Sequence, residues 1–154
     1  MRRALWCVAT LILVLAPGTS AQKAPAKQDR KKSEDEIVAA VVRYNTLAQR
    51  GVVFLSIAGR DPSPEVLHLL SVWYVRVLPA SRAVYVSVPN QAGLWKDKKS
   101  GDFGRYFEAY IEKRVSDTRA EVSAGWGQPC GTYVVVLLGG VWSVESYKPW
   151  ELCF

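Results

Sequence analysis

The side chain best suited to covalent chemistry in this chain is Cys130, which lies in the glycine-rich stretch AGWGQPCGTYVV at residues 124–135. A cysteine acts as a nucleophile when a base removes its proton and a further group orients that base. The sequence holds one histidine, His68, which lies 62 residues before Cys130. These two residues define one hypothesis, a small cysteine hydrolase with Cys130 as the nucleophile and His68 as the base.

Three features of the sequence weigh against that hypothesis. The motif QPCG at residues 128–131 resembles the QAC loop of caspases, but Pro129 replaces the small residue of that loop. The surrounding strands lack the parallel α/β pattern of that family, and cysteines of exported proteins are usually oxidised. We therefore assign no catalytic residue and keep the cysteine hydrolase as the alternative function.

A structural role for Cys130 fits the cysteine count better. The sequence has three cysteines, of which Cys7 lies in a leader that export would remove. Cys130 and Cys153 then form an even set, which favours a disulfide in an exported domain. With a hairpin tip at residues 139–140, Cys130 lies opposite Pro149, so the chain must bend just after Pro149 to bring Cys153 within bonding distance.

A second arrangement of reactive side chains is the carboxylate pair Glu108 and Glu112, of the kind that glycosidases use. These residues alternate with Tyr106 and Tyr110 on the expected solvent face of a strand. We therefore interpret them as solvated charges that interact with the neighbouring strand, and not as a catalytic pair. The sequence has no CxxC, no cluster with metal-ligand spacing, no P-loop and no GxSxG motif. We expect neither a metal nor a cofactor.

Aromatic side chains give the best indication of a binding function. Trp95 lies among three lysines in residues 89–105, a polar segment that is long for a loop of a compact domain. An exposed tryptophan there could stack on a sugar or another flat ligand, whereas a buried one would pack beneath the loop, which is the simpler interpretation. The candidate ligand-binding residues are Trp95, Tyr106 and Tyr110.

The N-terminus has the form of a secretory signal peptide. Arg2 and Arg3 give it a positive start, residues 4–16 are apolar, and a small-residue cleavage site ends at Ala21. An apolar segment of roughly 13 residues is too short to span a bilayer. We expect residues 1–21 to be cleaved, which leaves a secreted or periplasmic chain with no transmembrane segment.

The positive charge of the chain is concentrated near this leader. The sequence has 20 basic and 14 acidic residues, and the leader contains Arg2 and Arg3. Residues 22–33 hold five basic side chains against one acidic, and we interpret them as a basic flexible linker. Because the rest of the chain has 13 residues of each sign, we do not expect it to bind nucleic acid.

Residues 34–154 are sufficient for one domain. Ser33 and Glu36 have the form of a capping box, which predicts a helix that begins there and ends near Arg50, before Gly51. Apolar side chains recur within it at helical spacing. The residues expected on its buried face are Ile37, Val41, Tyr44 and Leu47.

A second, shorter helix is predicted by Ser63 as N-cap and Pro64 as the first helical residue, and it should end at Leu70. His68 then lies at the edge of this helix or in solvent. The residues expected to face the core are Val66, Leu69 and Leu70.

Strands make up most of the remaining domain. Apolar and polar residues alternate in residues 106–115 and 118–126, and Gly139 with Gly140 predicts a tight hairpin between residues 134–138 and 141–147. In the first of these segments Phe107, Ala109, Ile111 and Val115 share the face that should be buried. Residues 52–57, 72–77 and 83–88 are the other expected strands.

The expected fold class follows from this order of elements. The first helix should cover the apolar face of the C-terminal strands. We predict an α+β fold in which an N-terminal helix packs on a curved, roll-like antiparallel β-meander, accompanied by the short second helix.

Several pieces of the sequence also resemble a pattern in small exported bacterial proteins. These pieces are DPSPEVL, VRVLPAS, VSDTRAEV and CGTYVV followed by a glycine turn. No activity is attached to that group, so the resemblance implies no particular chemistry. In outline the fold resembles cystatin-like and nuclear-transport-factor-like rolls, but no motif of either occurs, and a shared fold does not assign a function.

The function that these observations favour is a non-catalytic binding or interaction domain. Its ligand is unknown, and its partner would be a component of the cell envelope or the extracellular space. Binding would use the outer face of the sheet, at Trp95, Tyr106 and Tyr110.

Overall fold

The computed structural model of the chain describes residues 27–47, 50–72, 75–87 and 94–151. The expected signal peptide and Cys153 lie outside these ranges, so export and the disulfide stay predictions. In chain order the elements are α1 (Lys27–Thr46), β1 (Gly51–Ile57), α2 (Pro64–Leu70), β2 (Val75–Pro79), η1 (Ala80–Arg82), β3 (Ala83–Val86), β4 (Leu94–Asp97), β5 (Phe103–Ser116), β6 (Arg119–Trp126), β7 (Gly131–Leu138) and β8 (Val141–Pro149).

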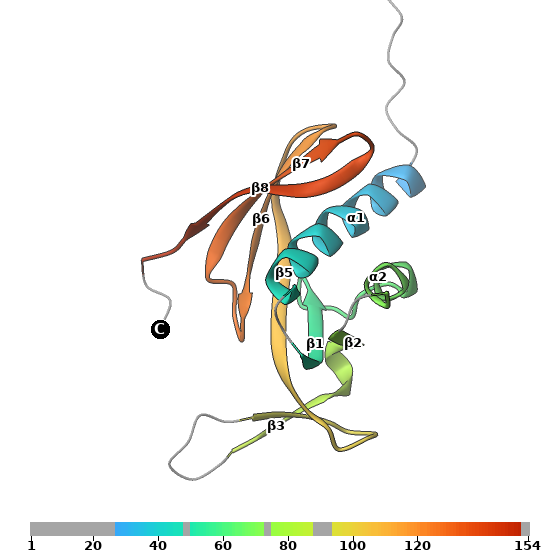
Figure 1. Cartoon of the computed structure of the whole chain (residues 1–154), viewed down its shortest axis with the longest axis vertical. Coiled ribbons are helices and arrows are strands. Elements are labelled where there is room, and N and C mark those ends of the chain that lie inside the picture. The colour runs from blue at the N-terminus through green and yellow to red at the C-terminus, as the bar shows by residue number, and fades with distance from the viewer. Residues whose placement is uncertain (1–26, 48–49, 73–74, 88–93, 152–154) are drawn as a thin grey trace, which may run out of the picture.

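This arrangement confirms the α+β class, because the described residues form two α-helices and a mostly antiparallel sheet of eight strands. Six strands lie side by side in the order β2-β1-β5-β6-β7-β8, and the β3–β4 pair joins them through β5. The helix α1 runs along the sheet beside β7 and β8, and α2 packs against α1 and β2 (Figure 1).

The centre of the sheet differs from the expected meander. β1 pairs in parallel with both of its neighbours, β2 and β5. Residues 52–56 of β1 are all buried, as is typical of a parallel strand that is covered on both faces. Parallel neighbours need a crossover connection, and α2 lies in the one between β1 and β2. Successive antiparallel pairing therefore describes β3 to β8 but not β1 and β2.

The long strand β5 joins the two parts of the sheet. It pairs first with β4 and β1 and then with β6, and its register shifts twice, the first time after Ile111. An extra residue in one strand reverses which face the following side chains occupy. Arg114 consequently pairs with buried Ala120, while Val115, expected on the buried face, is 46% exposed.

The core has two parts, one on each face of β1. The larger part contains residues 37–42 of α1, all at most 4% exposed, packed against buried side chains of the sheet such as Leu55 and Phe107. The smaller part consists of Val52, Phe54 and Leu78. Because neighbouring residues of a strand face opposite sides, Phe54 and Leu55 belong to different parts.

The helix α1 has different bounds from those predicted. It begins at Lys27, so Ser33 lies inside it rather than at its N-cap. The residues from Lys27 to Ser33 include no glycine or proline and several good helix formers, which lets the helix extend into the expected linker. The helix ends at Thr46 instead of near Arg50.

The helix α2 is confirmed with its predicted bounds and cap. The Ser63 Oγ accepts a hydrogen bond from the Val66 N–H at 3.2 Å and donates one to Asp35 of α1 at 2.7 Å. This N-cap therefore also ties the two helices together. Val66 and Leu70 are buried as expected, one helical turn apart.

Besides Val115, three more residues expected in the core are exposed instead. Leu69 is 37% exposed because the short helix α2 buries only the stripe that carries Val66 and Leu70. Tyr44 and Leu47 are 50% and 64% exposed. Tyr44 lies in the last turn of α1 and Leu47 just after its end, both beyond the stretch of residues 37–42 that is buried.

The predicted loop at residues 89–105 contains a strand. Within it, β4 pairs antiparallel with β3, so that Trp95 lies opposite Tyr85, and β4 also pairs with the start of β5. Lysines and glycines concealed this short strand in the sequence, and its pairing partners stabilise it.

Candidate binding site

Two of the three predicted binding residues, Trp95 and Tyr106, lie in contact, with ring centroids 4.6 Å apart. The ring of Tyr85 lies 5.3 Å from that of Trp95. We call Tyr85, Trp95 and Tyr106 the aromatic ladder, since they come from the neighbouring strands β3, β4 and β5. Trp95 and Tyr106 are partly buried and pack against the small cluster that contains Phe54. This favours the interpretation that Trp95 packs beneath its segment.

The third predicted residue, Tyr110, lies farther along β5, opposite Ser123 of β6. In the described part of the chain, no ring contact joins it to the ladder. Its neighbour on the same face, Glu112, accepts a hydrogen bond from the buried Ser123 Oγ at 2.7 Å. Glu112 thus satisfies a buried hydroxyl, which gives this member of the carboxylate pair a structural role.

The turn between β4 and β5 is held by the buried carboxylate of Asp97. This carboxylate accepts hydrogen bonds from the Arg82 guanidinium, from the backbone N–H groups of Lys99 and Ser100 and from the Ser100 Oγ. The Arg82 guanidinium holds the pKa of Asp97 far below its ordinary value, although burial opposes this shift. Asp97 therefore fixes the turn beside the ladder, and both of its carboxylate oxygens accept hydrogen bonds from within the chain.

A different group of aromatic residues surrounds a hollow of about 560 Å³. It lies where the connection between β6 and β7 meets the end of β8 and the last turn of α1. We call this hollow the aromatic pocket. Its five rings belong to Tyr44, Trp126, Tyr133, Tyr147 and Trp150.

The absence of a side chain at Gly131 allows the rings of the pocket to assemble. A Cβ atom at this position would lie 2.3 Å from Cε2 of Tyr147 and 2.9 Å from the carbonyl oxygen of Lys148. The ring of Tyr147 therefore covers Gly131 and stacks on Tyr133, with centroids 4.5 Å apart. Tyr44 meets the same Tyr133 ring edge-on at 6.0 Å, so Tyr133 forms the centre of the cluster.

Trp126 forms another wall of the aromatic pocket and is held on both sides. Its ring lies 5.0 Å from that of buried Phe107, in an edge-on arrangement. The guanidinium carbon of Arg105 lies 4.1 Å from the Trp126 centroid, within the range of a cation–π contact. These contacts fix the orientation of Trp126.

The polar groups of the pocket are neutral. Tyr133 is 3% exposed and donates a hydrogen bond to Asn45 Oδ1 at 2.9 Å, while Asn45 Nδ2 donates to the Val41 carbonyl at 2.9 Å. Burial raises the pKa of Tyr133 to about 12, so its hydroxyl stays protonated at neutral pH. Trp150 Nε1 donates to Thr132 Oγ1 at 3.0 Å. None of the described residues that line the pocket carries a charged side chain.

Cys130 lies at the edge of this pocket. Its N–H donates to the Ala124 carbonyl, and its carbonyl accepts from the Trp150 N–H, both at 3.0 Å. The expected register placed Cys130 opposite Pro149, but a shift after Val134 moves it opposite Trp150. Cys130 is therefore one residue nearer in register to Cys153 than predicted.

Among the described residues, none of those that line the pocket beside Cys130 could serve as the base that a hydrolase needs. The described residues that line the pocket include no histidine and no carboxylate. His68 is exposed on α2, whose N-cap is bonded to Asp35, whereas the pocket contains Tyr44 from the last turn of α1. Asp35 and Tyr44 are about nine residues apart, or roughly 14 Å along the helix axis. The geometry thus gives no support to a catalytic pair of Cys130 and His68.

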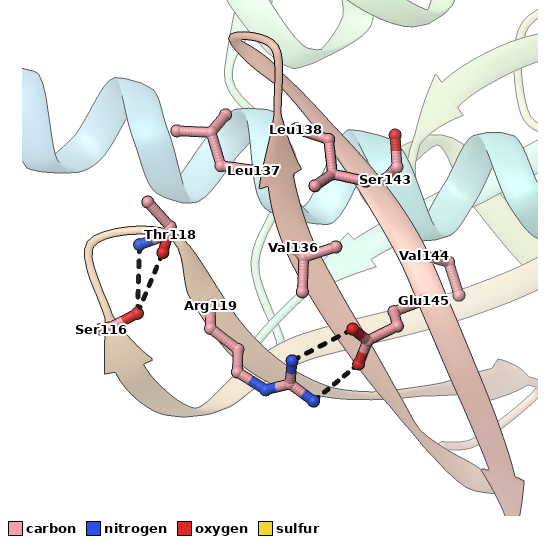
Figure 2. A pocket seen from close by; sticks show the side chains of 9 residues that line it. All are labelled: Ser116, Thr118, Arg119, Val136, Leu137, Leu138, Ser143, Val144 and Glu145. Carbon is pink, nitrogen blue, oxygen red and sulfur yellow. Dashed lines mark hydrogen bonds and ion pairs between the residues drawn. The ribbon is translucent and has the colours of Figure 1, made fainter.

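A second hollow, of about 350 Å³, lies between the β5–β6 turn and the strands β7 and β8 (Figure 2). Figure 2 shows Arg119 and Glu145 pointing toward each other, and two hydrogen bonds of 3.2 and 2.6 Å join them. The bond to Glu145 raises the pKa of Arg119. Both side chains are more than 40% exposed, and each forms its hydrogen bonds with the other. We therefore interpret this region as a surface ion pair and not as a ligand site.

Sequence reasoning missed the aromatic pocket. Tyr44 was assigned to the core, and neither Tyr147 nor Trp150 was selected. One signal was available, since pairing the two strands around Gly139 and Gly140 brings tyrosines of both strands together at their far ends. The contribution of α1 could not be read in this way, because no local pattern specifies where a helix end lies on a sheet.

No protein-family model, curated protein or solved structure matches this chain. In the described ranges, no helix is long and apolar enough to cross a membrane. The same ranges contain no group of three His, Cys, Asp or Glu side chains that could hold a metal ion. The resemblance to small exported bacterial proteins stays an expectation, and the site is interpreted from its own chemistry.

Proposed function

We propose that this chain is an exported, non-catalytic binding domain whose ligand site is the aromatic pocket. The observation that carries the proposal is one hollow of about 560 Å³ surrounded by five aromatic rings and neutral polar groups. Hollows of this size and composition suit small molecules with an apolar body and a few polar contacts. Three of the rings are reachable from solvent, since Tyr44, Tyr147 and Trp150 are 50%, 43% and 39% exposed.

The aromatic ladder contributes less to the proposed function. Trp95 and Tyr106 make their ring contacts with each other and with the buried cluster below them. Tyr110 lies apart from both, so the three residues first selected do not enclose a common space. We therefore assign ligand binding to the pocket and a packing role to the ladder.

Export and the disulfide belong to the same proposal. The charged and apolar leader at residues 1–21 would direct export, and Cys130 would pair with Cys153 in the oxidising compartment. The hydrogen bond between the Trp150 N–H and the Cys130 carbonyl supports this pairing. This bond holds Trp150, which lies three residues before Cys153, beside Cys130.

The binding function can be tested without a choice of ligand. The chain from residue 22 onward is incubated with a small-molecule filtrate of native cell envelope, purified again and denatured, and the released compounds are identified by mass spectrometry. A Tyr44→Ala/Trp150→Ala double variant serves as the control for the pocket. We expect at least one compound to be enriched by the natural chain and not by the double variant; equal recovery from both, or none from either, refutes the proposal.

A further inference from the structure

Resting on the proposed binding function, we infer that the ligand of the aromatic pocket is a neutral saccharide. Its sugar ring would stack on the exposed faces of Tyr147 and Trp150, with Tyr44 beside it. One face of Tyr147 is occupied by Tyr133, with the two centroids 4.5 Å apart, and the ring also lies against Gly131, so the ligand would contact the remaining exposed surface of the ring. The exposure of Tyr147 and Trp150, 43% and 39%, is consistent with this.

The chemistry of the rings favours a sugar over a purely apolar ligand. A pyranose presents a face of C–H groups whose weak positive polarisation suits the negative face of an aromatic ring. Its rim carries hydroxyl groups that must find hydrogen-bond partners when water is removed. A site for such a ligand needs exposed aromatic faces next to neutral donors and acceptors, which is the composition of this pocket.

The hydrogen-bonding capacity left in the pocket matches hydroxyl groups. Tyr133 uses its proton on Asn45, and a side-chain hydrogen bond with Tyr147 uses one lone pair of its oxygen, which leaves one lone pair as an acceptor. Asn45 uses one N–H on Val41 and one lone pair of Oδ1 on Tyr133, so one N–H and one lone pair stay available. A sugar hydroxyl both donates and accepts, and it can therefore satisfy either kind of group.

The same composition disfavours charged ligands. Burial of an ionised group requires an opposite charge or several strong hydrogen bonds, and the described residues that line the pocket have neutral side chains. Nucleotides also stack on aromatic rings, but their phosphates need cationic partners. Arg105, a cation beside the pocket, lies over the Trp126 ring, with its guanidinium carbon 4.1 Å from the centroid.

The experiment is an NMR titration of the isotopically labelled chain from residue 22 onward with three neutral trisaccharides, maltotriose, cellotriose and chitotriose, and with adenosine monophosphate. We expect at least one trisaccharide to bind, with its chemical-shift changes clustered on the pocket. Tyr44→Ala and Trp150→Ala should each weaken this binding about tenfold, because each variant removes one aromatic contact with the sugar. Tyr85→Ala removes a similarly exposed tyrosine from the ladder and should leave the affinity unchanged.

Two variants are used because Trp150→Ala also removes the hydrogen bond to Thr132, whereas Tyr44 lies on α1 and makes an edge-on contact with Tyr133. Thermal melts confirm that both fold. The inference is overturned if no trisaccharide binds at millimolar concentration, if both variants bind as tightly as the natural chain, or if adenosine monophosphate binds the pocket more tightly than every trisaccharide.

The outcome for the saccharide is separable from the outcome for the proposed function. If the envelope filtrate yields a pocket-dependent compound while the trisaccharides fail, the binding function stands and the ligand class is wrong. If both experiments fail, the pocket is not a ligand site. If the trisaccharides bind through the pocket and the filtrate yields a pocket-dependent compound, both proposals are supported.

Discussion

The aromatic ladder and the aromatic pocket are built from the same kinds of side chain but offer different surfaces. In the ladder, strands β3, β4 and β5 place their rings in a row, and the rings cover a small buried cluster. In the pocket, rings from α1, from the strands β6, β7 and β8 and from Trp150 just after β8 line a hollow. A group of aromatic residues therefore indicates a binding site when the backbone leaves space between the rings, and a packed surface when it does not.

The two regions also differ in the interactions that hold them in place. The ladder is bordered by the ionic network of Asp97 and Arg82 and by the contact between Lys96 and Phe103. The pocket is held by neutral hydrogen bonds, by stacking over Gly131 and by the cation–π contact between Arg105 and Trp126. The buried charge of Asp97 is stable because the Arg82 guanidinium and backbone N–H groups satisfy it, whereas an unpaired charge inside a small hollow would limit the ligands that the hollow accepts.

The largest expected effect tests whether the ladder depends on the cluster beneath it. Phe54→Ala removes a fully buried ring of that cluster and should lower the free energy of unfolding by about 3 to 5 kcal/mol, because a cavity is left behind. Urea denaturation measures this change. As a control, Leu69→Ala alters a residue that is 37% exposed and should have a much smaller effect. Equal effects of the two variants would contradict the packing role assigned to the ladder.

The next prediction concerns the covalent support of the pocket. A disulfide between Cys130 and Cys153 should stabilise the domain by about 3 kcal/mol in the chain-entropy model. Mass spectrometry of exported protein, alkylated without a reductant, should find neither cysteine modified. Two alkylated cysteines in oxidatively folded protein would reject the bridge and return Cys130 to the list of possible nucleophiles.

A matched pair of tryptophan variants sharpens the comparison further. Trp95→Ala should lower the free energy of unfolding by about 2 kcal/mol, through loss of buried apolar area, and leave ligand binding unchanged. Trp150→Ala should weaken ligand binding and lower the free energy of unfolding by less, since it removes a ring at the edge of the pocket. Denaturation curves and ligand titrations of both variants test this. If Trp95→Ala weakens binding and spares stability, the ligand site is on the ladder.

The next prediction concerns acid pH and involves no change of stability near neutral pH. It tests how Asp97, beside the ladder, contributes to the free energy of unfolding. The pKa of Asp97 is lowered in the folded chain by the Arg82 guanidinium. Its contribution to stability is complete above the ordinary carboxyl pKa of about 4 and is lost as the pH falls below it. Denaturant unfolding over a pH series should show this loss in the natural chain. The loss should be smaller in Asp97→Asn, and identical acid profiles would contradict the assignment.

The pocket should respond at the opposite end of the pH scale. Burial raises the pKa of Tyr133 from 10.0 to about 12 in the folded chain. A raised pKa contributes stability that is present below pH 10 and is lost as the pH rises through about 12. The Tyr133→Phe variant provides the control, because it should lack this alkaline loss. A steeper alkaline loss in Tyr133→Phe would show that Tyr133 is not the titrating group.

Local patterns in the sequence were sufficient for the α+β class and for several individual elements. Ser63 and Pro64 predicted the start of α2 because a cap and a fixed proline φ act within one turn of helix. Gly139 and Gly140 predicted the β7–β8 hairpin, and both have the positive φ that such a tight turn requires. These features depend on neighbours in the sequence, so the sequence by itself determined them.

Only the tertiary structure decided the rest. The parallel pairing of β1 depends on partners far away in the chain, and the register shifts in β5 and β8 change which face a residue occupies without leaving a local signal. Trp95 became part of a strand because β3 and β5 flank it. The aromatic pocket brings Tyr44 of α1 together with Tyr133 and Tyr147 of two other elements. A hollow between distant segments is set by how those segments pack, and a one-dimensional pattern of residue types does not encode that packing locally.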